Sequence, residues 1–253
     1  MKGELQMIIN THGDRSDPAV IILHPMGFNG SQFYEQLGPH FRGKYFFVAP
    51  DMGNHGKELR EFHSIEAEMS QLYIWLVKND LRDITLFYGA SMGAVGALHL
   101  FQHQDLQFQK IYLDGAPVAR LDPLMRTIFG PVLIWTRNSL KKNMEKANAE
   151  YMERYGEKMG REMGANFLKF SDASIQHIAQ ACVNGNAYPI SEENQARITF
   201  DWGSKELYTK TSMPLVKKLY PKARVIIREG YQHCEYLAKH PEDYVAGIEG
   251  LLL

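Results

Sequence analysis

A serine flanked by two glycines has the clearest chemical meaning in this sequence. The chain reads Gly89-Ala90-Ser91-Met92-Gly93, after the apolar run ITLFY and before the helical run AVGALHLFQ. A strand that turns directly into a helix strains the backbone at the serine, and side chains two residues away on either side would collide. Glycine at positions 89 and 93 removes those side chains. The pattern therefore predicts that the hydroxyl of Ser91 is presented as a nucleophile at the end of a strand.

A serine hydroxyl becomes a good nucleophile only when a base within hydrogen-bonding reach removes its proton. Of the ten histidines in the chain, His233 is the expected base, because its segment GYQH lies between the last apolar run and the final helical stretch. That location predicts a loop at the same end of the sheet as Ser91. His24 closes an apolar run, and we expect it to anchor a loop through hydrogen bonds to nearby backbone.

The imidazole of such a base needs a carboxylate that fixes its tautomer and stabilises its charge. The segment ITFDWGSKE offers Asp201 and Glu206, and both precede His233 and follow Ser91 in the chain. Glu206 is the preferred candidate, since it lies in the loop after the run and can reach the loop of His233. Asp201 and then Asp114 remain as alternative acids.

Two backbone amides are candidates for stabilising an oxyanion. Met92 follows the serine at the expected start of a helix, where the helix dipole places partial positive charge. Met26 lies in the segment LHPMG after the run AVIIL, and its amide is the expected second donor.

Short runs rich in β-branched and aromatic residues alternate with helical stretches. Runs such as AVIIL are apolar without alternation, as expected for parallel strands with helices on both faces. After Ser64, apolar residues recur at helical spacing behind this serine N-cap, which predicts a crossover helix. The expected strands cover residues 19–23, 45–48, 84–88, 110–113, 197–200 and 223–227.

The strand pattern stops after the run at 110–114, and long amphipathic segments follow. We therefore predict an α/β fold with a mostly parallel sheet, in which residues 1–118 and 190–253 form the core domain. Residues 119–189 are predicted to be a helical cap over the carboxyl edge of the sheet, where open α/β sheets bind ligands.

Composition limits the classes of partner. The formal net charge of −1 provides no basic field for nucleic acid, and no apolar stretch approaches the roughly 18 residues of a membrane span. The N-terminus lacks the pattern of a signal peptide, so a cytoplasmic location is the default expectation. The two cysteines, Cys182 and Cys234, lack metal-ligand spacing and are expected to be free thiols. We expect a small-molecule substrate and no cofactor, metal, nucleic-acid or membrane partner.

Together these motifs resemble the α/β-hydrolase superfamily, and within it the small, capped, esterase-like members. LHPMG is similar to the family's oxyanion loop, PDMGNHG to its PDxxGHG turn and GASMG to its serine turn. GSKE looks like the GxxD motif of the acid, and GYQHCEYLAKHPEDY like the GxxH motif followed by HPE. The resemblance implies that His233 is the base and that His240 is structural.

Three departures from the family pattern stand out. Pro25 replaces the second oxyanion-loop glycine, Met52-Gly53-Asn54 alters the turn, and Glu206 replaces the commoner aspartate. The reaction class expected is acyl transfer on a carboxylic ester through an acyl-enzyme. The same triad could instead serve a thioester, lactone, carbon–carbon bond or peracid, and a non-catalytic ligand-binding protein is the alternative from another class.

Overall fold

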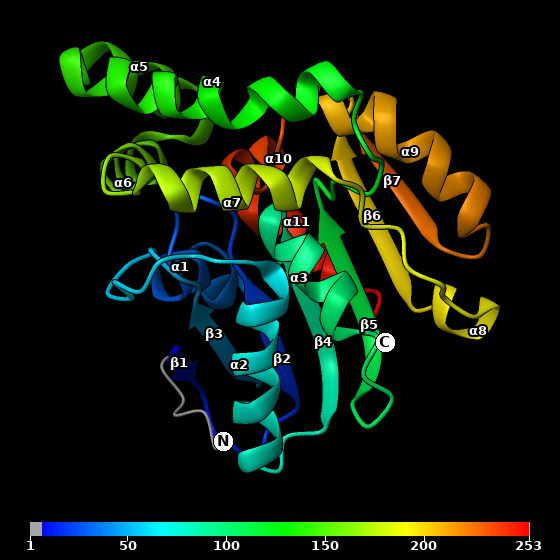
Figure 1. The fold of residues 1–253 in the computed structure, drawn as a ribbon. Helices are drawn as coiled ribbons and strands as arrows, with labels where there is room; N and C mark the ends of the chain where they lie inside the picture. Colours follow the sequence, from blue (N-terminus) through cyan, green and yellow to red (C-terminus); the bar gives the residue numbers. More distant parts are fainter. Residues whose placement is uncertain (1–6, 253) are drawn as a thin grey trace.

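The expected strands pair into one sheet in the computed structural model, which describes residues 7–252 apart from the side chains of residues 146–148. Within that range the sheet has seven strands in the order β1-β3-β2-β4-β5-β6-β7, and all neighbours are parallel except β1 and β3 (Figure 1). The strands are β1 (Ile8–His12), β2 (Ala19–Leu23), β3 (Phe46–Asp51), β4 (Asp83–Ala90), β5 (Gln107–Asp114), β6 (Ile198–Gly203) and β7 (Arg224–Arg228).

The register of the central strands brings their carboxyl ends to one edge. Leu23 of β2 pairs with Gly89 of β4, and Ala90 of β4 pairs with Asp114 of β5, which in turn pairs with Asp201 of β6. The loops that leave these strands therefore start side by side. This alignment is what allows residues far apart in the sequence to meet at a single site.

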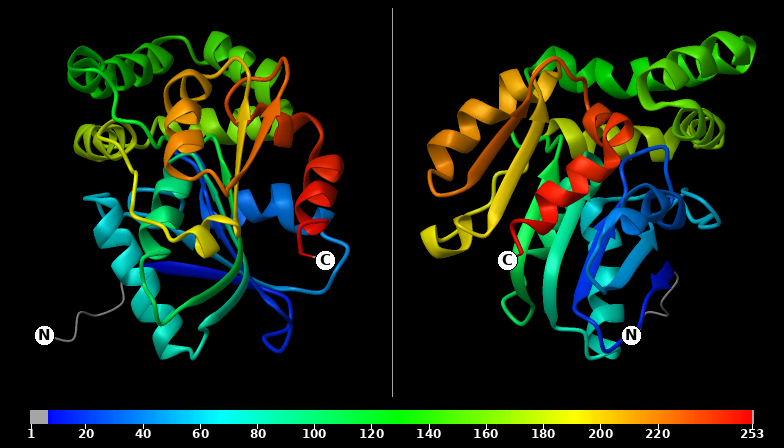
Figure 2. Two further views of the ribbon diagram at one scale, coloured as in Figure 1. Left: turned by 90° about the vertical axis from the view of Figure 1, so that its right-hand side faces the viewer. Right: turned by 180° about the vertical axis from the view of Figure 1, so that it is seen from behind.

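Strand β2 illustrates why both faces of the sheet are covered. All five of its residues are buried, and the last four alternate between two hydrophobic clusters on opposite faces. One cluster includes side chains of α1 (Gly30–Leu37) and α11 (Pro241–Glu249). The other includes side chains of α2 (Ile65–Lys78), α3 (Met92–Leu100) and α9 (Leu207–Leu219), and the views of Figure 2 show this division.

Helix α2 confirms the helix expected after Ser64. The Ser64 hydroxyl accepts a hydrogen bond from the backbone N–H of Ala67 at 3.2 Å, so the side chain satisfies a donor that the first turn leaves unpaired. The inward face of the helix is buried in the core. Within residues 7–252, three helices have five residues or fewer: η1 (Gly38–His40), α8 (Glu192–Gln195) and α10 (Glu235–Lys239).

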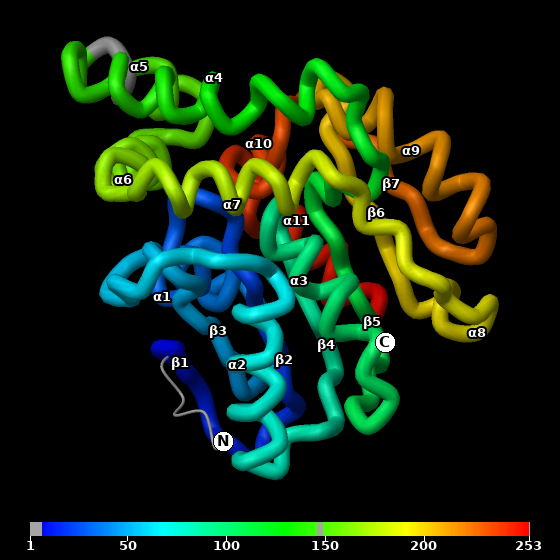
Figure 3. Tube along the Cα trace, in the orientation of Figure 1, coloured from blue at the N-terminus to red at the C-terminus, as the bar shows by residue number. Residues whose placement is uncertain are grey.

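Five helices lie between β5 and β6 in the described part of the chain, and four of them extend across the carboxyl edge of the sheet (Figure 1). These four are α4 (Pro123–Lys142), α5 (Met144–Tyr155), α6 (Glu157–Phe167) and α7 (Asp172–Val183). The tube trace in Figure 3 follows the chain from β5 through these helices to β6. Helices α4 and α7 pack on each other, and α7 also contacts α3 of the core. This arrangement confirms the helical cap inserted after β5.

One strand was missing from the sequence prediction. The segment IINTH forms β1 and pairs antiparallel with β3 at the sheet edge. Its residues are at most half-buried, so it lacks the continuous apolar run by which the inner strands were identified.

Among residues 7–252, no helix has the length and apolarity that crossing a membrane requires.

Candidate active site

The strand-to-helix turn after β4 presents Ser91 as the glycine pattern predicts. Ser91 has φ 52° and ψ −114°, a backbone conformation that residues other than glycine rarely adopt. Its backbone N–H donates to the carbonyl of Asp114 at 2.7 Å, which ties the turn to the neighbouring strand β5. A Cβ at Gly89 would lie 2.7 Å from the carbonyl carbon of Gly93, so the two glycines do pack against each other.

Gly93 is expected to be intolerant of a side chain. A methyl group there would lie 2.7 Å from the carbonyl carbon of Leu23, which is fixed in β2 and cannot move aside. We expect Gly93→Ala to lower the free energy of unfolding by about 3 kcal/mol, measured by urea denaturation. Gly247→Ala is the matched control, because nothing lies within 4 Å of its added Cβ in helix α11. A loss of stability as large in the control as in Gly93→Ala would contradict the steric explanation.

The imidazole of His233 meets the carboxylate of Glu206. His233 follows β7, and its Nδ1–H donates to Oε2 of Glu206 in a short hydrogen bond. The other carboxylate oxygen of Glu206, Oε1, accepts from the backbone N–H of Gly203 at 2.6 Å. Glu206 is 4% exposed, so this carboxylate is held in place by backbone at one oxygen and directs the other at the ring.

These contacts determine the protonation of His233. Burial is the largest single effect and lowers the pKa of the imidazole. The negative charge of Glu206, its hydrogen bond and the charge of Asp114 together outweigh burial, and the net effect is a pKa above the ordinary value. Because Nδ1 carries the hydrogen that faces Glu206, Nε2 is the nitrogen left to exchange a proton with a substrate or with Ser91.

The two alternative acids have other partners. Asp201 accepts a hydrogen bond from Nε of Arg228 at 2.9 Å and a second from the hydroxyl of Tyr112. Asp114 accepts from Tyr244 at 2.8 Å and from Tyr88 at 3.3 Å. Burial and then the charge of Asp201 raise the pKa of Asp114 to about 7. Glu206 is therefore the candidate acid that the fold brings to His233.

The two predicted oxyanion donors, Met26 and Met92, have free backbone amides in the described structure. Within residues 7–252, no acceptor receives a hydrogen bond from the backbone N–H of Met26 or Met92. Both residues line the same cavity as Ser91 and His233. A residue of the cap holds the loop of Met26 in place: the side-chain amide of Asn166 in α6 donates a hydrogen bond to the carbonyl of Gly27 at 3.0 Å. Two unpaired donors beside a serine can stabilise a negatively charged oxygen.

His24 has the structural position expected for it. Its Nδ1–H donates to the Pro25 carbonyl at 3.0 Å, and its Nε2 accepts from the backbone N–H of Met52 at 3.1 Å. Complete burial lowers the pKa of His24 to about 4, so the ring is neutral at ordinary pH. The histidine thus links the oxyanion loop to the turn after β3. His240 accepts a hydrogen bond from Tyr231 at 2.7 Å.

The cavity above Ser91 has a volume of about 200 Å³ and is lined in part by the cap. Its walls are almost entirely apolar, with methionine prominent among them. Residues from the cap that line it include Phe129, Leu133, Tyr155, Met159, Met163 and Ile178. The core contributes Phe28, Phe33 and Leu237. A neutral, apolar group therefore fits next to the serine better than a charged one.

Two cavity residues were not anticipated from the sequence. Cys182 and Cys234 were expected only to be free thiols, and both line the cavity. Cys234 has φ 53°, and this left-handed turn sits immediately after His233. Its position next to the base was a usable sequence signal, whereas that of Cys182 depends on how α7 lies over the sheet. Burial raises the pKa of both thiols.

Ser91 at the strand-to-helix turn and His233 of the histidine–carboxylate pair line one cavity together with residues of the inserted helices. No family model and no curated protein matches the sequence. Solved structures do match. A bromoperoxidase from Bacillus anthracis (TM-score 0.77, 15% identity) aligns over 97% of this chain and 95% of its own.

Two further structures agree with that match. An esterase from Exiguobacterium antarcticum (TM-score 0.74, 15% identity) aligns over 97% of this chain and 95% of its own. An alpha/beta hydrolase enzyme from a Medee basin deep-sea metagenome library (TM-score 0.73, 13% identity) aligns over 97% and 93%. The chain therefore has the α/β-hydrolase fold, which confirms the predicted fold class.

Proposed function

We propose that the protein is a serine hydrolase that cleaves a carboxylic ester of a small, apolar substrate through an acyl-enzyme. The observation that carries the proposal is the joint position of Ser91 and His233 in one cavity, with Glu206 bound to the far side of the imidazole. A strained serine, a base with a fixed tautomer and two unpaired amides are the parts that acyl transfer needs.

In the proposed reaction, Nε2 of His233 takes the proton of Ser91 as the serine oxygen bonds to the ester carbonyl carbon. The negative charge that develops on the carbonyl oxygen is stabilised by the N–H groups of Met26 and Met92. His233 then donates the proton to the departing alcohol, which leaves an ester on Ser91. A water molecule, deprotonated by the same imidazole, attacks this ester. His233 then returns the proton to the departing oxygen of Ser91, and the acid is released.

A fluorophosphonate probe tests the proposal directly, because it phosphonylates only a serine that is activated as a nucleophile. We expect one label per chain on Ser91 in the wild-type protein, located by peptide mass spectrometry, and none in Ser91→Ala. If neither protein is labelled, the cavity belongs to a ligand-binding protein whose site is idle.

Nitrophenyl esters of increasing acyl length test the substrate class. A cavity of about 200 Å³ lies below the roughly 300–1,000 Å³ of sites for drug-sized ligands. We therefore expect kcat/KM to rise with the first methylene groups and to fall again for long chains. A flat profile or a preference for charged acyl groups would count against an apolar acyl site. Higher activity on thioesters, lactones or peracids would change the proposed substrate class but leave Ser91 as the nucleophile.

The pH dependence of turnover should reflect the pairing of His233 with Glu206. Because only the neutral imidazole accepts the serine proton, kcat/KM is expected to increase as pH rises through the pKa of His233. The carboxylate raises that pKa, so the acid limb should lie above the ordinary histidine value of about 6.5. In Glu206→Gln the limb should move to lower pH, since the negative charge is lost. A limb that stays in place would show that Glu206 does not control the imidazole.

A further inference from the structure

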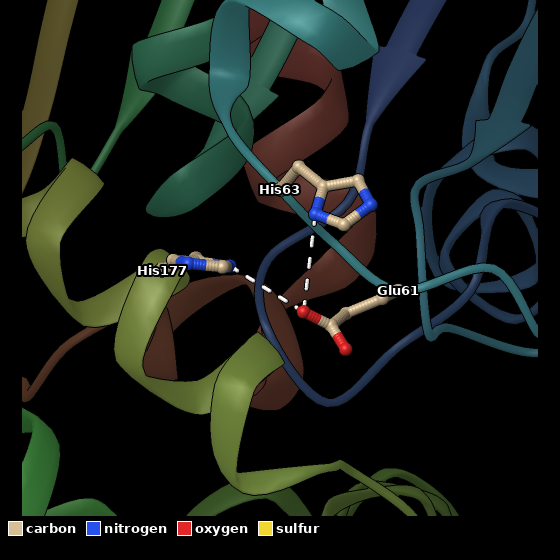
Figure 4. Close-up of side chains that lie close together, drawn as sticks. All are labelled: Glu61, His63 and His177. Carbon is tan, nitrogen blue, oxygen red and sulfur yellow. Dashed lines mark ion pairs between the residues drawn. The ribbon is translucent and has the colours of Figure 1, made fainter.

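A second group of chemically capable side chains lies at the junction between core and cap. Glu61 and His63 belong to the loop between β3 and α2, and His177 belongs to the cap helix α7 (Figure 4). One ligand atom of each lies within 4.8 Å of the other two. None of these three residues takes part in the proposed ester hydrolysis.

The separations within the group are too long for hydrogen bonds. Oε1 of Glu61 lies 3.8 Å from Nδ1 of His63 and 3.8 Å from Nδ1 of His177. Figure 4 shows the carboxylate oxygen facing both rings. Three ligand-type side chains thus converge without satisfying one another, which leaves room between them for a bound atom.

No basic side chain neutralises the carboxylate. Among the described residues, no lysine or arginine forms an ion pair with Glu61. The nearest arginine in the sequence, Arg60, is engaged by Glu68 at 2.7 Å and by Glu58 at 3.8 Å. The group therefore offers one negative charge and two imidazoles to a cation.

The loop and α7 are already positioned for joint binding. The backbone N–H of Phe62 donates to the hydroxyl of Ser174 at 3.1 Å, and Nδ1–H of His177 donates to the Phe62 carbonyl at 2.9 Å. The side chain of His63 is 62% exposed, so few neighbours restrict its rotation. Binding of a cation by the three side chains would therefore need side-chain motion and no change of fold.

From this geometry we propose that Glu61, His63 and His177 form a binding site for a divalent transition-metal cation of the Zn²⁺ type. Two imidazoles and one carboxylate suit such ions, whereas Ca²⁺ and Mg²⁺ prefer sets of oxygen ligands. With bonds of about 2.0–2.2 Å, tetrahedral zinc ligands lie roughly 3.3–3.6 Å apart, so each 3.8 Å separation from the carboxylate closes by a few tenths of an ångström. The two imidazole ligand atoms lie within 4.8 Å of each other, and rotation of the exposed His63 side chain closes that separation. A water molecule would complete the four ligands, since the side chain of His63 is 62% exposed to solvent.

Binding exchanges one proton partner at His177. For the cation to bind Nδ1, the single ring proton that is now directed at the Phe62 carbonyl moves to Nε2 through solvent, so the ring stays neutral. Since α7 also carries Ile178 and Cys182 in the wall of the cavity, the metal would hold that wall against the core. The proposed role is a link between cap and core, separate from the chemistry at Ser91.

Titration of the full chain with Zn²⁺ by calorimetry tests this site. We expect one ion per chain, and at least about tenfold weaker binding in His63→Gln, His177→Gln and Glu61→Gln. His40→Gln, in η1 and outside the group, is the matched control and should bind as the wild type does. Ca²⁺ and Mg²⁺ should give no comparable binding. Undiminished binding in His63→Gln and His177→Gln, or no binding at all, would overturn the proposal.

Spectra of the Co²⁺-loaded protein distinguish this site from the thiols and His233 in the cavity. We expect ligand-field bands without thiolate-to-metal charge transfer, and loss of those bands in His63→Gln. Amide hydrogen exchange in residues 172–183 should slow on addition of Zn²⁺ in the wild type but not in His63→Gln. Thiolate charge transfer, or exchange in α7 that is unaffected by the metal, would contradict the link.

Discussion

Replacing Ser91 by alanine is expected to lower kcat for ester hydrolysis roughly 10⁶-fold while the fold stays intact. The methyl group keeps the Cβ that the strained turn already accommodates, and it removes only the oxygen that would form the acyl bond. Residual turnover would come from the two amides and the cavity acting on an attacking water. Steady-state kinetics with the best nitrophenyl ester measures the loss.

Ser70→Ala serves as the control for this prediction. Ser70 is exposed on α2, where its hydroxyl donates to the carbonyl of Glu66 at 2.7 Å, far in the sequence from the loops of the site. Its kcat should match that of the wild type. Should Ser91→Ala retain more than a small fraction of the activity, another group must be the nucleophile, and the mechanism built on the strand-to-helix turn fails.

The sequence was most informative where local geometry alone dictates residue type. The turn at Ser91 leaves no room for side chains at Gly89 and Gly93, so its signature is complete within five residues. The buried parallel strands were equally visible, because coverage of both faces makes them apolar throughout. Strand β1 was not predicted, because a half-buried strand at the sheet edge needs no continuous run of apolar residues.

The acid illustrates what sequence order cannot decide. Asp201 and Glu206 lie five positions apart, and either could reach His233 as far as the sequence indicates. The fold separates them, because Asp201 is within β6 and its side chain meets Arg228. Glu206 lies past the end of that strand and turns toward the loop after β7.

Contacts between cap and core are harder still to predict from sequence patterns. His177 follows Glu61 by more than a hundred residues, and their proximity depends on how α7 packs across the sheet edge. The same packing decides that Cys182 faces the cavity. Helical periodicity predicts which face of α7 is apolar, but it does not indicate which core loop lies beneath it.

The carboxylate that partners His233 gives the second large expected effect. Glu206→Gln should lower kcat by about 10⁴-fold, because an amide can stabilise the wrong tautomer of the imidazole and cannot stabilise its positive charge. The substitution is nearly isosteric, so the hydrogen bond from the Gly203 N–H can persist and the loop should keep its shape. Measured KM should change far less than kcat, since the loss concerns the transition state.

Asp114→Asn is the matched control, since it makes the same chemical change at another buried carboxyl group. An asparagine oxygen can still accept the hydrogen bonds of Tyr244 and Tyr88, so kcat should stay within about tenfold of the wild type. Its effect should appear in stability instead. The native pKa of about 7 lies above the unfolded value of about 3.9, so the native state binds the extra proton and stability falls as pH rises between these values. Asp114→Asn should flatten that decline in urea denaturation; a 10⁴-fold loss of kcat here, with Glu206→Gln active, would transfer the role of the acid to Asp114.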